Sequence, residues 1–196
     1  TPCGTAQLVP ENAFHLDLGP LACVLEDTKR AYDLEAALTP ALSETFAPVP
    51  TGLVDFGFGA SRYWVRTKLQ NVGQVEGTWW VTHDMPIFEE MRVRLVLADG
   101  SVRTLLEMSG TDTFGVRPIP HRHLVSLVTL QPGEQAELVI DYVTELGTQM
   151  PLFAESADQF VERTQTEMAN HLMLIAALLG MGLISTLYFY SLEGPA

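Results

Sequence analysis

A run of nearly uncharged residues near the C-terminus constrains this chain more than any other feature. The run, HLMLIAALLGMGLISTLYFY, spans residues 171–190 and follows a segment rich in carboxylates. As a helix, residues 172–190 would rise about 28 Å, close to the roughly 30 Å of a bilayer's hydrocarbon core. Tyr188 and Tyr190 stand at one end, where a membrane interface favours aromatic side chains. We expect a transmembrane helix at 171–190, a juxtamembrane helix at 156–170 before it, and a short tail at 191–196.

A buried core helix is the alternative for the same run. It would need cover on every side from a domain whose core is already committed to sheets. Within the run, Ala176, Ala177, Gly180 and Gly182 give a helix one face of small residues. Such a face lets helices pack closely in a membrane. It fits contact with further helices or with a second copy of the chain, and a homodimer stays open.

Charged residues are confined almost entirely to the part of the chain before this run. The formal net charge is −13, and all eleven Lys and Arg and every acid except Glu193 precede His171. An acidic balance of this kind argues against binding to a nucleic-acid backbone, which needs a dense basic surface. Residues 1–20 show no sustained period and include Pro2, Pro10, Gly19 and Pro20, so they predict an irregular lead-in.

Strand patterns dominate residues 21–155. The segment RYWVRTKLQNV (62–72) alternates a core-type face with a face of Arg, Trp and Lys side chains. Asp99-Gly100 predicts a two-residue hairpin turn, and QPG at 131–133 predicts another turn. Short helices are expected around 34–38 and in TPALSETF (39–46), where Thr39 is the N-cap. Closely spaced strands with almost no helix between them predict an antiparallel β-sandwich over 21–155.

Several segments, in order, resemble one known family. They are VLEDTKRAYDLEAAL (24–38), FGFGASRYWVRTKLQN (56–71), WWVTHDMPIFEEMRVRLVLADG (79–100), RPIPHRHLVSLVTLQPGEQAELVIDYV (117–143) and PLFAESADQF (151–160), ahead of the apolar helix. The chain resembles the periplasmic or extracellular module, type 2, of bacterial seven-transmembrane receptors with diverse intracellular signalling modules. The resemblance implies a mainly β fold, a jelly-roll-like sandwich similar to carbohydrate-binding modules, in the periplasm and attached to the inner membrane.

The same resemblance implies a function and a larger protein. Such a domain would sense a ligand, often supposed to be a carbohydrate, and pass the signal through membrane helices to a kinase or cyclase output domain. The sequence stops at SLEGPA, after one apolar helix. We expect a receptor cut short here in preference to a single-span protein.

Cys3 and Cys23 are the only two cysteines of the chain. They lie outside any C-x-x-C pair, which excludes a structural zinc site. In an exported protein they are expected to form a disulfide that holds the N-terminal segment, and the alternative is two small buried side chains.

Candidate ligand-binding residues come from two predicted strands with guanidinium side chains. Trp64 shares a strand face with Arg66, and Arg92 shares one with Arg94. An aromatic platform among guanidinium groups suits a sugar ring and its hydroxyls. The alternative, which we favour for Trp64, is a packing role, with the arginines solvated or paired with acids such as Glu90.

Two further groups complete the candidate set. Trp79 and Trp80 are adjacent, so in a strand one enters the core and the other is a stacking candidate. His121, Arg122 and His123 form the second group, and the two histidines are expected on one strand face. A metal site that also uses His83 or Asp84 is disfavoured, and we expect no metal and no cofactor.

The sequence contains no arrangement of residues typical of an enzyme. GFGASR (57–62) precedes a strand, whereas a phosphate-binding loop precedes a helix, and no credible Ser/His/Asp order is present. The leading hypothesis is a ligand-sensing periplasmic domain that recognises a carbohydrate or related small molecule. The alternatives are a protein-interaction or dimerisation module without a small ligand, and an accessory domain for carbohydrate processing held by a membrane tether.

Overall fold

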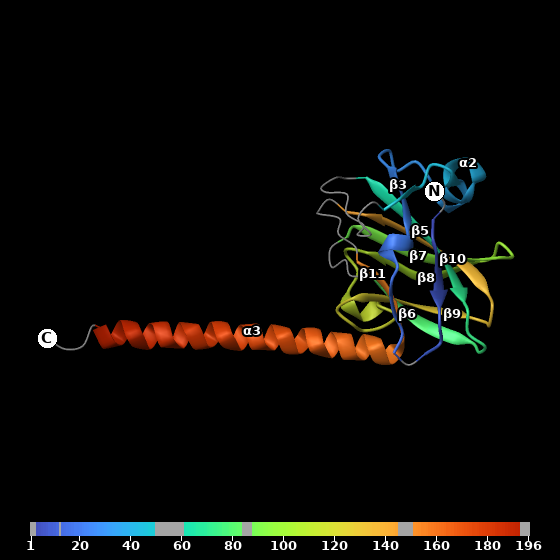
Figure 1. Cartoon of the computed structure of the whole chain (residues 1–196). Coiled ribbons are helices and arrows are strands. Elements are labelled where there is room, and N and C mark those ends of the chain that lie inside the picture. The colour runs from blue at the N-terminus through green and yellow to red at the C-terminus, as the bar shows by residue number, and fades with distance from the viewer. Residues whose placement is uncertain (1–2, 12, 50–60, 84–87, 145–150, 193–196) are drawn as a thin grey trace. The chain divides into compact units, whose positions relative to one another are not determined.

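The computed structural model describes residues 3–11, 13–49, 61–83, 88–144 and 151–192. These residues form two β-sheets and one long C-terminal helix, so the expected mainly β class is confirmed (Figure 1). The chain divides into two compact units, Thr1–Ala157 with both sheets and Asp158–Ala196 with the helix. The jelly-roll order and the likeness to carbohydrate-binding modules stay predictions.

The larger sheet has seven strands. They are β1 (Thr5–Leu8), β3 (Cys23–Asp27), β4 (Ala47–Pro48), β5 (Arg62–Asn71), β7 (Glu90–Leu97), β8 (Val102–Ser109) and β10 (Gln135–Val143). The order is β4-β3-β5-β10-β7-β8, with every one of these pairs antiparallel. Strand β1 is an exception to the antiparallel prediction, because it pairs in parallel with the later half of β5.

The smaller sheet has four antiparallel strands in the order β2-β11-β6-β9. Their bounds are His15–Asp17 for β2, Gly77–His83 for β6, Leu124–Leu130 for β9 and Leu152–Glu155 for β11. Side chains of both sheets meet in one hydrophobic core. Tyr63 and Val65 enter it from the larger sheet, and Trp79 and Val81 enter it from the smaller sheet. The predicted alternation therefore fixes the inner face of each strand.

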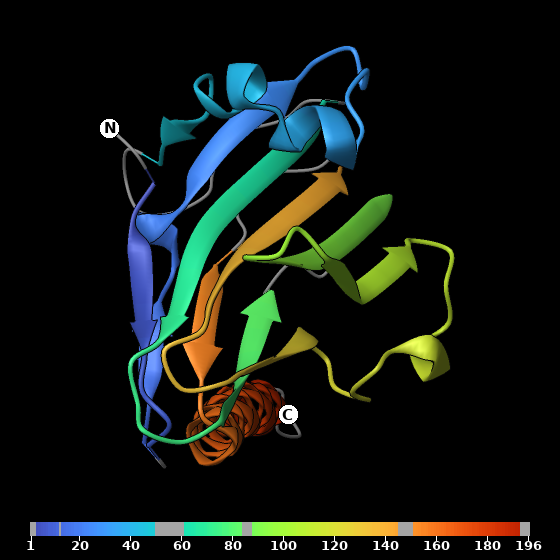
Figure 2. The same ribbon diagram turned by 90° about the vertical axis from the view of Figure 1, so that its right-hand side faces the viewer.

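Two short helices build a second, smaller core against the opposite face of the larger sheet. Helix α1 (Leu34–Leu38) begins at Asp33, and α2 (Pro40–Ser43) begins at Thr39, whose hydroxyl accepts from the Leu42 N–H as predicted. Figure 2 shows α1 and α2 close to β3 and β5. The cluster contains Trp64 together with Cys23, Ala37, Phe46 and Val139. The larger sheet is thus buried on both faces where these helices lie.

The prediction of an irregular lead-in at 1–20 is wrong for the described residues. Residues 5–8 form β1 in the larger sheet, and residues 15–17 form β2 in the smaller sheet. Gly19–Leu21 adds one turn of 3-10 helix. Both strands are short, and each pairs with a strand far away in sequence, so local periodicity gives little sign of them.

Turns form at both predicted places, but the β7–β8 connection covers the four residues 98–101, so the predicted two-residue length is wrong. Gly100 (φ +81°) closes the β7–β8 hairpin beside Asp99, and Gly133 (φ +74°) lies in the turn before β10. Positive φ values carry little penalty for glycine. Phe114–Val116 forms a turn of 3-10 helix in the connection between β8 and β9.

Helix α3 spans Ala157–Leu192 without a break. The juxtamembrane segment expected at 156–170 and the span expected at 171–190 are parts of this one helix, which begins directly after Ser156. Its most apolar window has a mean hydropathy of 2.1, and none of that window is buried, which speaks against a core helix. By length and composition α3 is a candidate membrane span.

Cys3 and Cys23 form a disulfide, with 5.3 Å between their Cα atoms, so the expected pairing is confirmed. Cys23 on β3 is the register partner of Arg66 on β5. Thr5 on β1, two residues after Cys3, is the register partner of Lys68 on β5. Two different strands, β3 and β1, thus share one edge of β5, and the disulfide joins them near the point where one gives way to the other.

Removing this disulfide should destabilise the sheet unit. The cysteines are 20 residues apart, and closing a loop of this size corresponds to about 3 kcal/mol of unfolding free energy. Tryptophan fluorescence of the C3S/C23S variant in nanodiscs, followed through denaturant unfolding, measures the loss, because all three tryptophans lie before residue 81. An unfolding free energy equal to that of the oxidised wild type would contradict the role of the disulfide.

His83 gives the sheet unit a pH-dependent stability. Its imidazole is fully buried with Nε2 3.1 Å from the Ser126 hydroxyl, and burial lowers its pKa from 6.5 to about 3. Below pH 6.5 His83 is protonated in the unfolded chain but stays neutral in the folded chain. The contribution of neutral His83 to the unfolding free energy is therefore fully present above pH 6.5 and is lost as the pH falls towards 3. Between pH 7 and 5 the loss should be about 2 kcal/mol.

Denaturant unfolding at pH 7, 6 and 5 measures this loss. H83Q should lack this share of the pH dependence whatever its absolute stability. H121N, at a partly exposed histidine, should keep it. A pH slope in H83Q as steep as that of the wild type would assign the effect to other groups.

Candidate functional site

The outer face of the larger sheet carries polar side chains in rows that follow the strand register. One row consists of Thr5, Lys68, Glu137 and Val96, from β1, β5, β10 and β7. The next outward row along β5 contains Arg66, Val139 and Arg94, and the row after it contains Trp64, Asp141 and Arg92. Trp64 and Arg66 therefore share a face of β5, and Arg92 and Arg94 share a face of β7, as predicted, with β10 between the two strands.

Trp64 and Arg66 lie under α1 and α2 and take part in packing. Trp64 is 1% exposed, which rules it out as an open stacking platform and agrees with the favoured packing role. Arg66 donates two hydrogen bonds of 2.8 Å to the Glu137 carboxylate and one of 2.7 Å to the Ser43 hydroxyl. Its guanidinium carbon also lies 4.8 Å from the centre of the Phe46 ring. The Arg66 side chain is thus committed to joining the helices to the sheet.

Arg92 and Arg94 both bind Asp141, an acid that the sequence did not single out, and Arg92 also pairs with Glu90, as the alternative expected. Asp141 is 1% exposed, and its two oxygens accept from Arg94 Nη1 at 2.5 Å and Arg92 Nη1 at 3.1 Å. Arg62 lies 3.9 Å from the same carboxylate and bonds to Glu90 at 2.8 Å. One buried carboxylate therefore lies within 4 Å of three guanidinium groups, and we name Asp141 with Arg62, Arg92 and Arg94 the arginine cluster.

A hollow of about 230 Å³ borders the arginine cluster. It is lined by Glu90, Arg92, Glu107, Met108, Ser109 and Asp112. Its charged groups are already paired: Arg92 bonds to Glu90 and Glu107, and Asp112 accepts from the Ser109 N–H. A ligand here would have to displace existing contacts.

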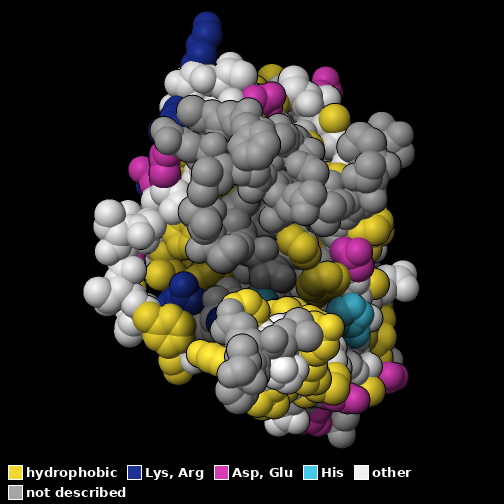
Figure 3. All heavy atoms as spheres, turned by 90° about the vertical axis from the view of Figure 1, so that its left-hand side faces the viewer, with side chains coloured by type: hydrophobic (Ala, Val, Ile, Leu, Met, Phe, Trp, Pro, Cys, Tyr) yellow, Lys and Arg dark blue, Asp and Glu magenta, His cyan; other side chains and the backbone are white. Residues whose placement is uncertain are grey.

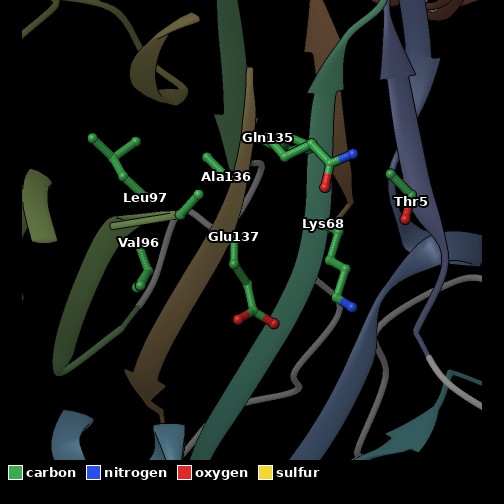
Figure 4. A pocket seen from close by; sticks show the side chains of 9 residues that line it. Thr5, Lys68, Val96, Leu97, Gln135, Ala136 and Glu137 are labelled. Carbon is green, nitrogen blue, oxygen red and sulfur yellow. The ribbon is translucent and has the colours of Figure 1, made fainter. Parts of the chain in front are cut away.

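A second hollow of about 220 Å³ lies on the same face, and we name it the β5–β10 depression. Its lining residues are Thr5, Lys68, Leu69, Val96, Leu97, Ala98, Gln135, Ala136 and Glu137. Figure 4 shows Lys68 and Glu137 on adjacent strands, with Thr5 on β1 beyond Lys68. Within the described part of the chain, the side chains of Thr5, Lys68 and Gln135 make no hydrogen bond or ion pair. The β5–β10 depression therefore offers uncommitted donors and acceptors.

The adjacent tryptophans follow the predicted alternation. Trp79 is buried in the main core and donates from Nε1 to the Val9 carbonyl at 3.1 Å. Trp80 points to the outer face of the smaller sheet and is half-buried, in register with the exposed Leu127. Trp80 is therefore the member of the pair that remains a stacking candidate.

The histidine group lies in a bend, and its expected place on a strand is wrong, because β9 begins only at Leu124. The rings of His121 and His123 are 5.2 Å apart, and Arg122 Nε donates to His123 Nε2 at 3.0 Å. His83 is bonded to Ser126 inside the core, whereas Asp84 and residues 57–60 of the glycine-rich segment lie outside the described residues. No group of three potential metal ligands occurs among the residues that the structure describes.

Charged and hydrophobic side chains are interspersed on the face drawn in Figure 3. The exposed apolar side chains of the sheet unit include Phe114 (52%) and Val116 (58%), in the connection that leads to the histidine group. Arg117 lies over the Phe114 ring at 4.8 Å and donates to the carbonyls of His121 and Arg122. These contacts hold the connection in a defined shape.

A family model described as 7TMR-DISM extracellular 2 matches residues 19–156, which cover both sheets almost completely. The chain belongs to this family. It is an extracellular domain of a membrane receptor, and the N-terminal unit lies outside the cytoplasm. The candidate span α3 follows directly after the matched residues, which fits this assignment. A search of curated proteins found no match.

Sequence reasoning missed Asp141 and Glu137. Both lie in QAELVIDYV, an apolar segment in which each looks like an isolated acid. They are four residues apart, so strand alternation places them on one face, and two arginines on a neighbouring predicted strand gave the complementary charge. The pairing of β10 between β5 and β7 was the missing information.

Removing the charge of Asp141 should destabilise the sheet unit. D141N leaves the guanidinium groups of the arginine cluster close together without their shared anion. The side chains of these arginines are 17–26% exposed to solvent. We therefore expect D141N to lower the unfolding free energy by about 2–3 kcal/mol, less than the 3–5 kcal/mol lost when a fully buried pair is broken. Denaturant unfolding measures this loss of unfolding free energy, with E107Q as the control variant.

Glu107 is 65% exposed, so E107Q should cost less than about 1 kcal/mol. A D141N variant as stable as E107Q would show that solvent and salt screen the guanidinium charges of the arginine cluster, and that the buried carboxylate has no special role.

Proposed function

We propose that this 7TMR-DISM extracellular 2 domain is a sensor that binds a polar small molecule, of the carbohydrate class, in the β5–β10 depression. The observation that carries the proposal is the set of uncommitted polar side chains there. Lys68, Gln135 and Thr5 surround the depression, whereas Arg66, Arg92 and Arg94 on the same face are paired with acids. Hydroxyl groups, which donate and accept, suit such a lining.

The size of the β5–β10 depression favours a small ligand. Its volume of about 220 Å³ is below the roughly 300–1,000 Å³ typical of drug-sized sites. The lining contains no aromatic side chain among its nine residues, so recognition would rest on hydrogen bonds and on contact with Val96 and Leu97. A single sugar residue, or a molecule of that size, is the ligand we propose.

The route from the domain to the membrane begins at the end of β11. Glu155 is fully buried, and its carboxylate contacts His15 Nδ1 at 2.8 Å and the Thr82 hydroxyl at 3.3 Å. These contacts tie the last residue of β11 to the neighbouring strands β2 and β6. Only Ser156 separates Glu155 from α3. A change in sheet packing would thus reach α3 through a short and firmly held connection.

A protein-interaction or dimerisation module is the second candidate. Leu127, 44% exposed, lies beside half-buried Trp80 on the outer face of the smaller sheet. Exposed apolar side chains next to an aromatic ring are common where proteins bind one another. This face is separate from the β5–β10 depression, so the two candidates can be tested by different substitutions.

Filling the β5–β10 depression should abolish ligand binding. In A98W, a large ring enters the hollow without altering any charge. Titration calorimetry of the full chain in nanodiscs, with a panel of neutral and acidic monosaccharides, should show binding to the wild type and at least tenfold weaker binding to A98W.

L127W is the matched control, because it adds a similar ring to the other sheet, and it should bind like the wild type. Loss of binding in L127W with retention in A98W would move the ligand site to the smaller sheet. Absence of binding by every sugar in the panel would favour the interaction module.

A further inference from the structure

We propose that the β5–β10 depression selects a small anionic polyol, with a carboxylate on a sugar-like ring, and that Lys68 binds the carboxylate. This inference rests on the proposed function and adds the charge of the ligand. It follows from the way in which the charges around the depression are paired. A chain with a net charge of −13 would otherwise be expected to repel anions.

Among the described residues that line the depression, Glu137 is the only acid, and Arg66 already neutralises it. The two hydrogen bonds of 2.8 Å from Arg66 Nε and Nη2 occupy both of its oxygens. Paired, two-pronged contacts of this kind are among the strongest between charged side chains. Glu137 lies opposite Lys68 in register, yet no ion pair joins them in the described part of the chain. The depression therefore has one positive charge in excess.

The Lys68 ammonium is exposed and has hydrogen-bonding capacity to spare. An ammonium group has three N–H donors, and none of them is used by a described residue. Acids elsewhere on the domain act on a bound anion only weakly, because salt screens charges beyond about 8–10 Å. A carboxylate in direct contact with Lys68 is attracted at short range, where screening is least.

The remaining lining suits the other parts of such a ligand. Gln135 supplies both an amide donor and a carbonyl acceptor, and Thr5 supplies a hydroxyl on the far side of Lys68. Val96 and Leu97 give an apolar surface on the β7 side. A ring with several hydroxyls and one carboxylate can use all of these groups together. A neutral sugar would leave the ammonium group without an anionic partner.

The other hollow on this face has the opposite character. It is lined by Glu90, Glu107 and Asp112 with a single arginine, so it has an excess of negative charge. An anion entering there would face like charges. The preference for an anionic ligand therefore belongs to the β5–β10 depression alone among the two described hollows.

The chain offers a direct probe, because Lys29 and Lys68 are its only lysines. Reductive methylation with ¹³C keeps the positive charge and gives each lysine its own NMR signal. The full chain in nanodiscs would be titrated with D-galacturonate and D-glucuronate, and in parallel with D-galactose and D-glucose. K29M and K68M variants assign the signals, and Lys29 is an exposed control outside the depression.

We expect at least one acid to shift the Lys68 signal saturably while the Lys29 signal stays in place. Its neutral counterpart should bind about 10–100-fold more weakly, as expected for loss of one charge-assisted hydrogen bond. Calorimetry with unmethylated K68M should show the same loss for the acid and little change for the neutral sugar, whereas K29M should bind like the wild type.

Equal binding of acidic and neutral sugars, or an unchanged preference in K68M, would overturn the charge inference and leave the proposed sensor intact. Binding that shifts neither lysine signal but is lost in A98W would also overturn the role of Lys68. Absence of binding by all four sugars would contradict the carbohydrate-class sensor itself as well as the inference that rests on it.

Discussion

Strand β5 is the element on which the rest of the structure depends, because it must satisfy two different environments on its outer face. Its inner face is buried along its length, from Tyr63 to Leu69, in the core shared by the two sheets. Its outer face is buried under α1 and α2 at Trp64 and Arg66 but exposed at Lys68. The change from packed to open surface occurs over two residues, and the β5–β10 depression lies on the open side of it.

The change from packed to open surface coincides with a change of the strand that pairs with one edge of β5. β3 covers the edge from Arg62 to Arg66, and β1 covers it from Lys68 onward in the opposite direction. The Cys3–Cys23 disulfide joins the two covering strands near this boundary. Arg66 stands at the same boundary and uses its guanidinium group for α1, α2 and Glu137 at once. Arg66 pairs with Glu137, and no acid among the described residues pairs with the neighbouring Lys68.

Much of the fold could be predicted from the sequence, because local patterns determine which elements form. Alternation gave the two faces of β5 and of Trp79-Trp80, Asp99-Gly100 gave the hairpin, and Thr39 gave the start of α2. Strands β1 and β2 could not be predicted in the same way, because they are short and their pairing partners lie far away in the chain. The bend at His121–His123 likewise differs from the strand that periodicity suggested.

The candidate site was predicted only in part. Trp64, Arg66, Arg92 and Arg94 do share a face, but their availability depends on contacts that periodicity cannot show. Trp64 is covered by helices, and the arginines are neutralised by Glu137, Asp141 and Glu90, which come from strands and positions fixed only by the pairing of β10 and β7. Lys68 was visible as one member of the polar face. That it has no acidic partner among the described residues could not be predicted, because it depends on the pairing of Glu137 with Arg66.

The most direct test of ligand sensing on the larger sheet is hydrogen–deuterium exchange of the full chain in nanodiscs, with and without saturating sugar acid. The account predicts slower exchange in peptides that cover residues 66–70, 96–98 and 135–137, around the β5–β10 depression, and unchanged exchange in β9. Protection confined to β6, β9 and β11, with none around Lys68, would place the ligand on the smaller sheet and contradict the account.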